Sequence, residues 1–186
     1  MSRVEILPIE RALEYRELLT PKDEEDIARF SSVRRVQEVS AWRSLLRWTL
    51  SDMGLCSEYA VAYDSVGAPC LADCDLFISV SHSRTHVAIA ISQTKCAIDI
   101  ESLDRDFERV ATRYASNNER SLLADSMIAP SLHLPLIWSA KEAMYKHSGR
   151  VGLDLLNDLV INKVSNTQIN NMPWQIHDNH IVVYTC

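Results

Sequence analysis

The stretch between residues 138 and 146 is the most informative part of the chain. It reads Trp138-Ser139-Ala140-Lys141-Glu142-Ala143-Met144-Tyr145-Lys146. Glu142 and Lys146 are four residues apart, so a helix places both side chains on one face, with Trp138 one turn earlier. A glutamate–lysine pair at this spacing is usually a surface ion pair that contributes about 0.3–0.5 kcal/mol. The pair alone therefore indicates no functional site.

A second segment, Ala97-Ile98-Asp99-Ile100-Glu101, lies about forty residues upstream. Its alternation predicts a strand, in which Asp99 and Glu101 point to one face about 6.6 Å apart. Such a pair is most often part of a solvated sheet face. Together with Glu142 and Lys146, however, it gives three carboxylates and an amine, which favours Mg²⁺ shared with a phosphate ligand.

The third segment is Phe77-Ile78-Ser79-Val80-Ser81-His82-Ser83. A histidine between two serines is compatible with an ordinary turn. It can also present an imidazole and hydroxyls to an anion.

These three segments, in this order, resemble the signature of the 4′-phosphopantetheinyl transferase superfamily, specifically the Sfp type. The resemblance covers roughly residues 63–161, with a looser match upstream at Arg43-Ser44-Leu45-Leu46. One departure is the turn Gly67-Ala68-Pro69, because the family commonly has a lysine between the glycine and the proline. A cation that contacts phosphate in the family is therefore absent here.

The resemblance implies the 4′-phosphopantetheinyl transferase fold, which is α+β with two similar subdomains packed as a pseudodimer around an active-site cleft. Independently, the predicted helices and strands segregate once in each half of the chain, which also favours α+β over a doubly wound sheet. We expect an N-terminal subdomain over residues 1–92 that contacts the nucleotide side of coenzyme A. A C-terminal subdomain over residues 93–186 would carry the metal and catalytic motifs, and the two would form one compact body.

The activity implied is that of a holo-acyl-carrier-protein synthase. Such an enzyme transfers 4′-phosphopantetheine from coenzyme A to a serine of an apo acyl or peptidyl carrier protein and releases 3′,5′-ADP. This reaction serves pathways such as fatty acid or polyketide biosynthesis. We expect Asp99, Glu101 and Glu142 to bind Mg²⁺, with Glu142 and Lys146 as catalytic residues. The residues expected to contact coenzyme A are Arg43, Ser81, His82, Lys141 and Lys146.

Two other functions use the same residues. A metal-dependent phosphohydrolase would direct the carboxylates to water and a pyrophosphate like that of coenzyme A. A non-catalytic module would bind coenzyme A or a carrier protein without turnover, although a simple binder has no need of all three carboxylates and Lys146.

Composition limits the partners, the cysteine chemistry and the cellular location that we expect for the protein. The chain has 186 residues and a formal net charge of −6, so no nucleic-acid partner is expected. Its five cysteines lack Cys-x-x-Cys spacing, and neither a disulfide framework nor a zinc ribbon follows from them. The N-terminus lacks the apolar core of a signal peptide, and no run is long enough to cross a membrane. We expect a cytoplasmic monomer that does not contact membranes.

Periodicity and turn residues predict the remaining elements. Helices are expected over residues 33–53, 107–114 and 132–147, and further helices after the capping residues Thr20 and Ser116. Strands are expected over residues 4–9, 59–63, 77–80, 85–92, 96–101 and 159–164, with a final hairpin of 174–177 and 180–185 around Asp178-Asn179.

Overall fold

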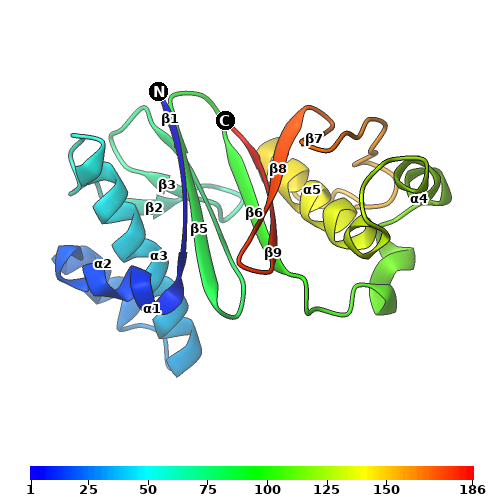
Figure 1. Cartoon of the computed structure of the whole chain (residues 1–186). Helices are drawn as coiled ribbons and strands as arrows, with labels where there is room; N and C mark the ends of the chain where they lie inside the picture. Colours follow the sequence, from blue (N-terminus) through cyan, green and yellow to red (C-terminus); the bar gives the residue numbers. More distant parts are fainter. The chain divides into compact units, whose positions relative to one another are not determined.

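The computed structural model describes every residue from Met1 to Cys186, and these residues form two units. Unit 1 comprises Met1–Cys96 together with Cys186, and unit 2 comprises Ala97–Thr185. Each unit contains one long helix and an antiparallel sheet of three or four strands, which confirms the α+β class (Figure 1). The structure divides the chain after Cys96, whereas we expected the division after residue 92. The functions expected for the two halves stay predictions.

The main sheet of unit 1 has the order β1-β5-β4, with every neighbouring pair antiparallel. Its strands are β1 (Ser2–Pro8), β5 (His86–Ser92) and β4 (Phe77–His82). β5 is central and buried along its whole length, as its run of apolar residues requires. A separate hairpin joins β2 (Val61–Tyr63) to β3 (Pro69–Leu71). Its turn contains Gly67 at a φ of 82°, a conformation that favours glycine.

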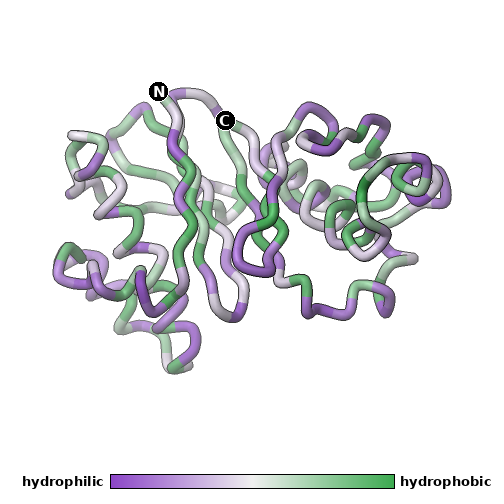
Figure 2. Tube along the Cα trace, in the orientation of Figure 1, coloured by the Kyte–Doolittle hydropathy of each residue, from purple (hydrophilic) through white to green (hydrophobic).

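The helices of unit 1 are α1 (Ile9–Ala12), α2 (Pro21–Ile27) and α3 (Val33–Asp52), with a 3₁₀ segment η1 (Leu13–Leu18). α2 begins as predicted, with Pro21 as its first residue, and Thr20 and Asp23 form a capping box on either side of this proline. Leu45, Leu46 and Leu50 of α3 share one hydrophobic core with β5. Figure 2 shows the hydrophobic residues of β5, in contrast to the hydrophilic α2.

α2 is fastened to α3 by an ion-pair network inside unit 1. Arg47 donates from Nε and Nη2 to the two carboxylate oxygens of Asp23, at 2.7 and 2.8 Å. Arg43 donates from Nη1 to Asp23 at 2.8 Å, and all three side chains are at most 1% exposed. Two buried guanidiniums therefore share one buried carboxylate, and Asp26, at the edge of the network, supplies Arg43 with a second.

The sheet of unit 2 has the order β6-β9-β8-β7. Its strands are β6 (Ala97–Ser102), β9 (His180–Thr185), β8 (Met172–His177) and the short β7 (Gln168–Ile169). The predicted hairpin between β8 and β9 is confirmed. Asp178 and Asn179 occupy its turn with φ values of 43° and 58°, as a type I′ turn requires.

The helices of unit 2 are α4 (Asn117–Ala124) and α5 (His133–Ser148), with two 3₁₀ segments, η2 (Glu108–Arg113) and η3 (Pro130–Leu132). α5 ends at Gly149, which adopts the left-handed conformation with a φ of 64°. Leu136, Ile137 and Ala140 of α5 share a core with Ile181 and Val183 of β9. This packing fixes the helix of the sequence motif over the sheet that contains β6.

Two predicted elements differ from the structure. Residues 107–114 form the 3₁₀ segment η2 rather than an α-helix. The strand expected over residues 159–164 is absent apart from one bridge at Val164. Here the backbone N–H groups that would pair with another strand bond to side chains instead. The N–H of Ile161 donates to Glu119 Oε1 at 2.9 Å, and the N–H of Asn162 donates to Asn170 Oδ1 at 3.0 Å. Apolar alternation cannot reveal this competition.

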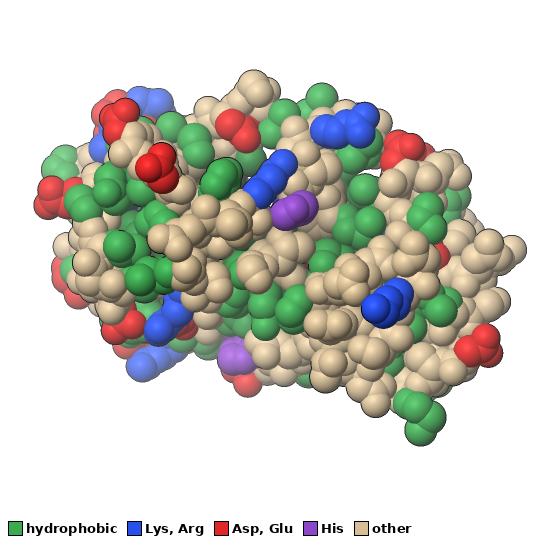
Figure 3. All heavy atoms as spheres, turned by 90° about the horizontal axis from the view of Figure 1, so that it is seen from above, with side chains coloured by type: hydrophobic (Ala, Val, Ile, Leu, Met, Phe, Trp, Pro, Cys, Tyr) green, Lys and Arg blue, Asp and Glu red, His purple; other side chains and the backbone are tan.

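None of the helices is both long enough and apolar enough to span a bilayer. On the face of the molecule drawn in Figure 3, acidic and basic side chains are scattered among hydrophobic and uncharged ones.

The buried network generates a stability prediction. We expect Asp23→Asn to lower the free energy of unfolding by about 3–5 kcal/mol, because it leaves buried Arg47 without a balancing charge and Arg43 with Asp26 alone. Asp52→Asn is the matched control, since Asp52 forms only an exposed pair with Arg3, and its cost should be about 0–1 kcal/mol. Urea unfolding followed by circular dichroism measures both values. Equal costs for the two variants would contradict a structural role for the network.

Candidate active site

β6 supplies two carboxylates on one face of the unit 2 sheet. Asp99 pairs across the ladder with Val183 and Glu101 pairs with Ile181. Both of these partners belong to the core that α5 covers. Residues opposite one another on adjacent strands project to the same face. Asp99 and Glu101 therefore share one face of β6, as the alternation in the sequence predicted, and in the structure that face meets α5.

Asp99 is held by two donors from α5. Ser139 Oγ donates to Asp99 Oδ2 at 2.9 Å, and Lys146 Nζ donates to Asp99 Oδ1 at 2.9 Å. Lys146 Nζ also donates to the carbonyl oxygen of Ile98 at 2.8 Å. Because Asp99 is only 3% exposed, its charge depends on these partners rather than on water.

Glu101 is oriented by a different pair of donors. Trp138 Nε1 donates to Glu101 Oε1 at 2.8 Å, and Arg105 Nη1 donates to the same oxygen at 2.6 Å. The guanidinium of Arg105 lies 4.4 Å from the centre of the Trp138 ring and 5.2 Å from that of Phe107. This stacking holds Arg105 in place, because a guanidinium is attracted to aromatic faces. The second oxygen of Glu101 has no donor from these two residues.

Glu142 is the third carboxylate, and its side chain makes no hydrogen bond or ion pair. Burial raises the pKa of Glu142, and the nearby Asp99 charge raises it further, while Lys146 opposes the shift. Burial and Asp99 also raise the pKa of Glu101, against the lowering effect of Arg105. Three carboxylates thus meet two cations in a half-buried space, which leaves negative charge uncompensated.

This donor set fits a hard divalent cation. Mg²⁺ binds oxygen ligands and is commonly held by one or two carboxylates that share it with phosphate oxygens. Burial and the neighbouring Asp99 charge raise the pKa values of Glu101 and Glu142, and a bound cation would offset both effects. The residues present therefore fit Mg²⁺.

Lys141 is located differently from the sequence prediction. Its side chain is fully buried, and Nζ lies 2.8 Å from Glu119 Oε1 and 2.7 Å from the carbonyl oxygen of Leu155. Glu119 in turn accepts hydrogen bonds from the backbone N–H groups of Ser116 and Ile161. Lys141 therefore ties α5 to α4 and the following loop. A contact with coenzyme A conflicts with this placement, because the amine is enclosed by protein.

Arg43 also conflicts with its predicted role as a phosphate ligand. It is 1% exposed, and its guanidinium is bound to Asp23 and Asp26 inside unit 1. Helical spacing alone could not distinguish a surface arginine from a buried one. A phosphate could reach it only after this network was broken.

The structure brings His82 together with a different arginine. Arg35, near the start of α3, places Nη1 3.3 Å from His82 Nε2 at the end of β4. Glu38 lies between the arginines of this segment, 2.7 Å from Arg34 and 3.6 Å from Arg35. Ser81, the preceding residue on β4, is only 7% exposed. Two arginines and a histidine thus surround one carboxylate, which leaves a net positive surface suited to an anion.

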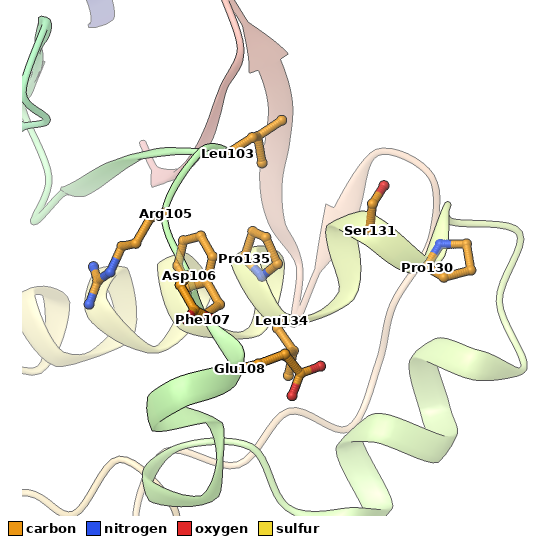
Figure 4. Close-up of a pocket in the computed structure, with 9 residues that line it drawn as sticks. All are labelled: Leu103, Arg105, Asp106, Phe107, Glu108, Pro130, Ser131, Leu134 and Pro135. Atoms are coloured by element: carbon orange, nitrogen blue, oxygen red, sulfur yellow. The ribbon is translucent and has the colours of Figure 1, made fainter.

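A pocket of about 270 Å³ in unit 2 has Arg105 in its wall (Figure 4). Its walls come from the segment after β6, from η3 and from the start of α5, and they consist of Leu103, Arg105, Asp106, Phe107, Glu108, Pro130, Ser131, Leu134 and Pro135. Arg105 belongs both to this wall and to the ion pair with Glu101. A ligand that bound Arg105 from the pocket would therefore alter the surroundings of Glu101.

Sequence comparison covers the same region. Residues 95–181 match the family model described as the 4′-phosphopantetheinyl transferase superfamily. The chain is therefore similar to this superfamily over 87 of its 186 residues. It is also 34% identical over 98 residues to enterobactin synthase component D of Salmonella typhimurium, an alignment that covers 51% of this chain. The chain spans only 42% of that relative's length.

The superfamily segment contains the whole carboxylate cluster together with Lys146. Arg43, Ser81 and His82 lie before it. Sequence reasoning did not identify Ser139 or Arg105 as members of the transferase-like site. Ser139 was visible within the motif, three residues before Glu142, whereas Arg105 gave no signal beyond a positive charge shortly after Glu101.

The electrostatics of Glu142 generate a prediction for the metal-free protein. The pKa of Glu142 is raised in the fold from its ordinary value of 4.5, so the folded state binds this proton more tightly than the unfolded chain does. Stability should therefore fall as pH rises from about 4.5 through the folded-state pKa, and it should stay lower at neutral pH. We expect Glu142→Gln to reduce this pH-dependent loss of stability. At neutral pH it should raise Tm by on the order of 2–4 °C for each kcal/mol gained in the free energy of unfolding.

Thermal melts in the presence of a chelator, from about pH 4 to pH 8, test this expectation. Glu108→Gln is the matched control, because the side chain of Glu108 is 77% exposed. A Glu142→Gln variant that melted below the wild type at neutral pH would show that Glu142 stabilises the fold.

Proposed function

We propose that this protein is a Mg²⁺-dependent 4′-phosphopantetheinyl transferase of the Sfp type. It would transfer the 4′-phosphopantetheine group of coenzyme A to a serine of an apo carrier protein and release 3′,5′-ADP. One observation carries this proposal. β6 and α5 bring together the side chains of Asp99, Glu101, Glu142 and Lys146, and all four residues lie within the segment that matches the superfamily. The transfer is phosphoryl-type, which needs positioning and charge neutralisation more than covalent catalysis.

Asp99, Glu101 and Glu142 would hold the cation. A bound Mg²⁺ supplies charge neutralisation on the pyrophosphate of the donor. Ser139 and Lys146 keep Asp99 in position, and Trp138 with Arg105 does the same for Glu101. These supporting contacts fix the carboxylates before substrate arrives.

Glu142 would act as the general base. Its carboxylate has no hydrogen-bond partner in the protein, and burial raises its pKa in the metal-free site, so it is available to accept a proton. In this role it takes the proton from the attacking serine hydroxyl. Lys146, one helical turn further on, would stabilise the negative charge that develops on the transferred group.

The nucleotide end of coenzyme A would be bound by residues of unit 1. The pair of Arg35 and His82, rather than Arg43, offers cationic and imidazole donors for the 3′-phosphate. The approach of an anion would compete with Glu38 for Arg35, whose distance of 3.6 Å from Glu38 indicates a weak pair. Ser81 stays a proposed neighbour of the same phosphate.

Incubation with coenzyme A, Mg²⁺ and a panel of apo carrier proteins tests the proposed reaction. We expect the intact mass of at least one carrier to rise by the mass of phosphopantetheine, and we expect a chelator or Asp99→Asn to reduce the rate by at least about 100-fold. Glu108→Gln should retain the wild-type rate. Release of free phosphopantetheine without carrier modification would establish the hydrolase instead. Coenzyme A binding without any product would establish a binding module.

A second experiment compares coenzyme A with dephospho-coenzyme A as the donor. We expect wild-type kcat/KM to be higher with coenzyme A by on the order of tenfold or more, because charge-assisted hydrogen bonds contribute about 1.5–3 kcal/mol. Arg35→Gln and His82→Gln should shrink that preference. Arg29→Gln is the control, because Arg29 is exposed and pairs with Glu25. An unchanged preference in the Arg35 and His82 variants would remove both residues from the 3′-phosphate site.

A further inference from the structure

Two of the five cysteines lie where the chain enters and leaves unit 2. Unit 2 begins at Ala97 and ends at Thr185, and these two residues form the last pair of the antiparallel β6–β9 ladder. The next position on each strand is a cysteine, Cys96 on one side and Cys186 on the other. Opposed residues of an antiparallel pair project to the same face, with Cβ atoms about 4.5–5.5 Å apart. A disulfide needs about 3.5–4.5 Å, so only a small approach of the strand ends separates the two arrangements.

The two thiols already interact. The contact between them lowers the pKa of Cys186 and raises the pKa of Cys96. Cys96 is 6% exposed, and its Sγ donates to the carbonyl oxygens of Phe77 at 3.6 Å and Ala90 at 3.7 Å. Cys186 is exposed. The more accessible thiol is therefore also the one more readily ionised, which is the combination that makes a cysteine reactive.

We propose that Cys96 and Cys186 form a reversible disulfide that links the two points where the chain enters and leaves unit 2. Both cysteines are free thiols in the structure, so the bond is a modification of the state described here. The proposal concerns a pair of residues outside the carboxylate cluster, and it does not depend on the transferase activity.

The oxidant is a small-molecule disulfide, such as oxidised glutathione. The Cys186 thiolate attacks one sulfur of that disulfide, which forms a mixed disulfide and releases one small thiolate. Cys96 then loses its proton to solvent and attacks the Cys186 sulfur, which releases the second small thiolate. The protein loses two electrons and two protons, and the small-molecule disulfide is reduced to two thiols.

Closure of this bond would constrain unit 2 as a whole. The two cysteines bracket a loop of about 90 residues, and a disulfide across a long loop stabilises mainly by restricting the unfolded chain. The bond would also fix the start of β6, because Cys96 directly precedes this strand and lies three residues before Asp99. The base of the strand that carries two of the three carboxylates would then be covalently held.

Equilibration of the reduced full chain with mixed reduced and oxidised glutathione tests the proposal. The reaction is quenched in denaturant with an alkylating reagent, and intact mass together with peptide mapping shows which of the five thiols are protected. We expect protection of two thiols and a linked peptide pair that contains Cys96 and Cys186. The oxidised protein should melt on the order of 10 °C above the reduced protein.

Two variants make the result specific. Cys186→Ser changes an exposed side chain, and it should leave all remaining thiols alkylated and remove the difference in Tm. Cys56→Ser, also at an exposed position, should retain the protected pair. Alkylation of Cys186 to the same extent as Cys56 would overturn the proposal. So would a link through Cys70 or Cys74, or a mixed disulfide at Cys186 that Cys96 does not resolve.

Discussion

The hydrogen-bonded clamp between Asp99 and α5 is the interaction on which the candidate site depends. Ser139 and Lys146 occupy the two oxygens of a buried carboxylate, and thereby lock the motif helix to β6 in one register. Glu142 lies between these two donors in the sequence, so the same register places it next to Asp99 and Glu101. Its own carboxylate receives no hydrogen bond from the protein. The clamp therefore holds three carboxylates close together in a partly buried site. Burial, followed by the Asp99 charge, raises the pKa values of Glu101 and Glu142.

Both units use buried ion pairs to fasten helices. In unit 1, Asp23 and Asp26 of α2 pair with Arg43 and Arg47 of α3. In unit 2, Glu119 of α4 balances Lys141 of α5. Buried charges of this kind are costly unless they are partnered, and here hydrogen bonds meet them except at Nε of Arg43. As a result, several basic residues of the motif regions are structural. The cations left near the proposed ligand sites are Lys146 and Arg105 in unit 2 and Arg35 in unit 1.

Local pattern predicted the elements that carry the site. The 3.6-residue periodicity and Gly149 gave α5 to within one residue at each end, and the alternation at Asp99 and Glu101 gave the correct face of β6. Burial of charged residues was not predictable, because a lysine at Lys141 or an arginine at Arg43 has the same helical spacing whether it meets solvent or a carboxylate on another helix. The strand expected over residues 159–164 does not form for a related reason. Side chains distant in the sequence accept the hydrogen bonds of its backbone N–H groups.

The central claim is that the carboxylates held by β6 and α5 form one divalent-cation site. Calorimetric titration of the chelator-treated protein with Mg²⁺, in the absence of coenzyme A, tests it most directly. We predict a single saturable binding event that Asp99→Asn and Glu142→Gln each weaken by at least about tenfold, and that Glu108→Gln leaves unchanged. Equal Mg²⁺ affinity in all four proteins, or no saturable binding by the wild type, would contradict the account.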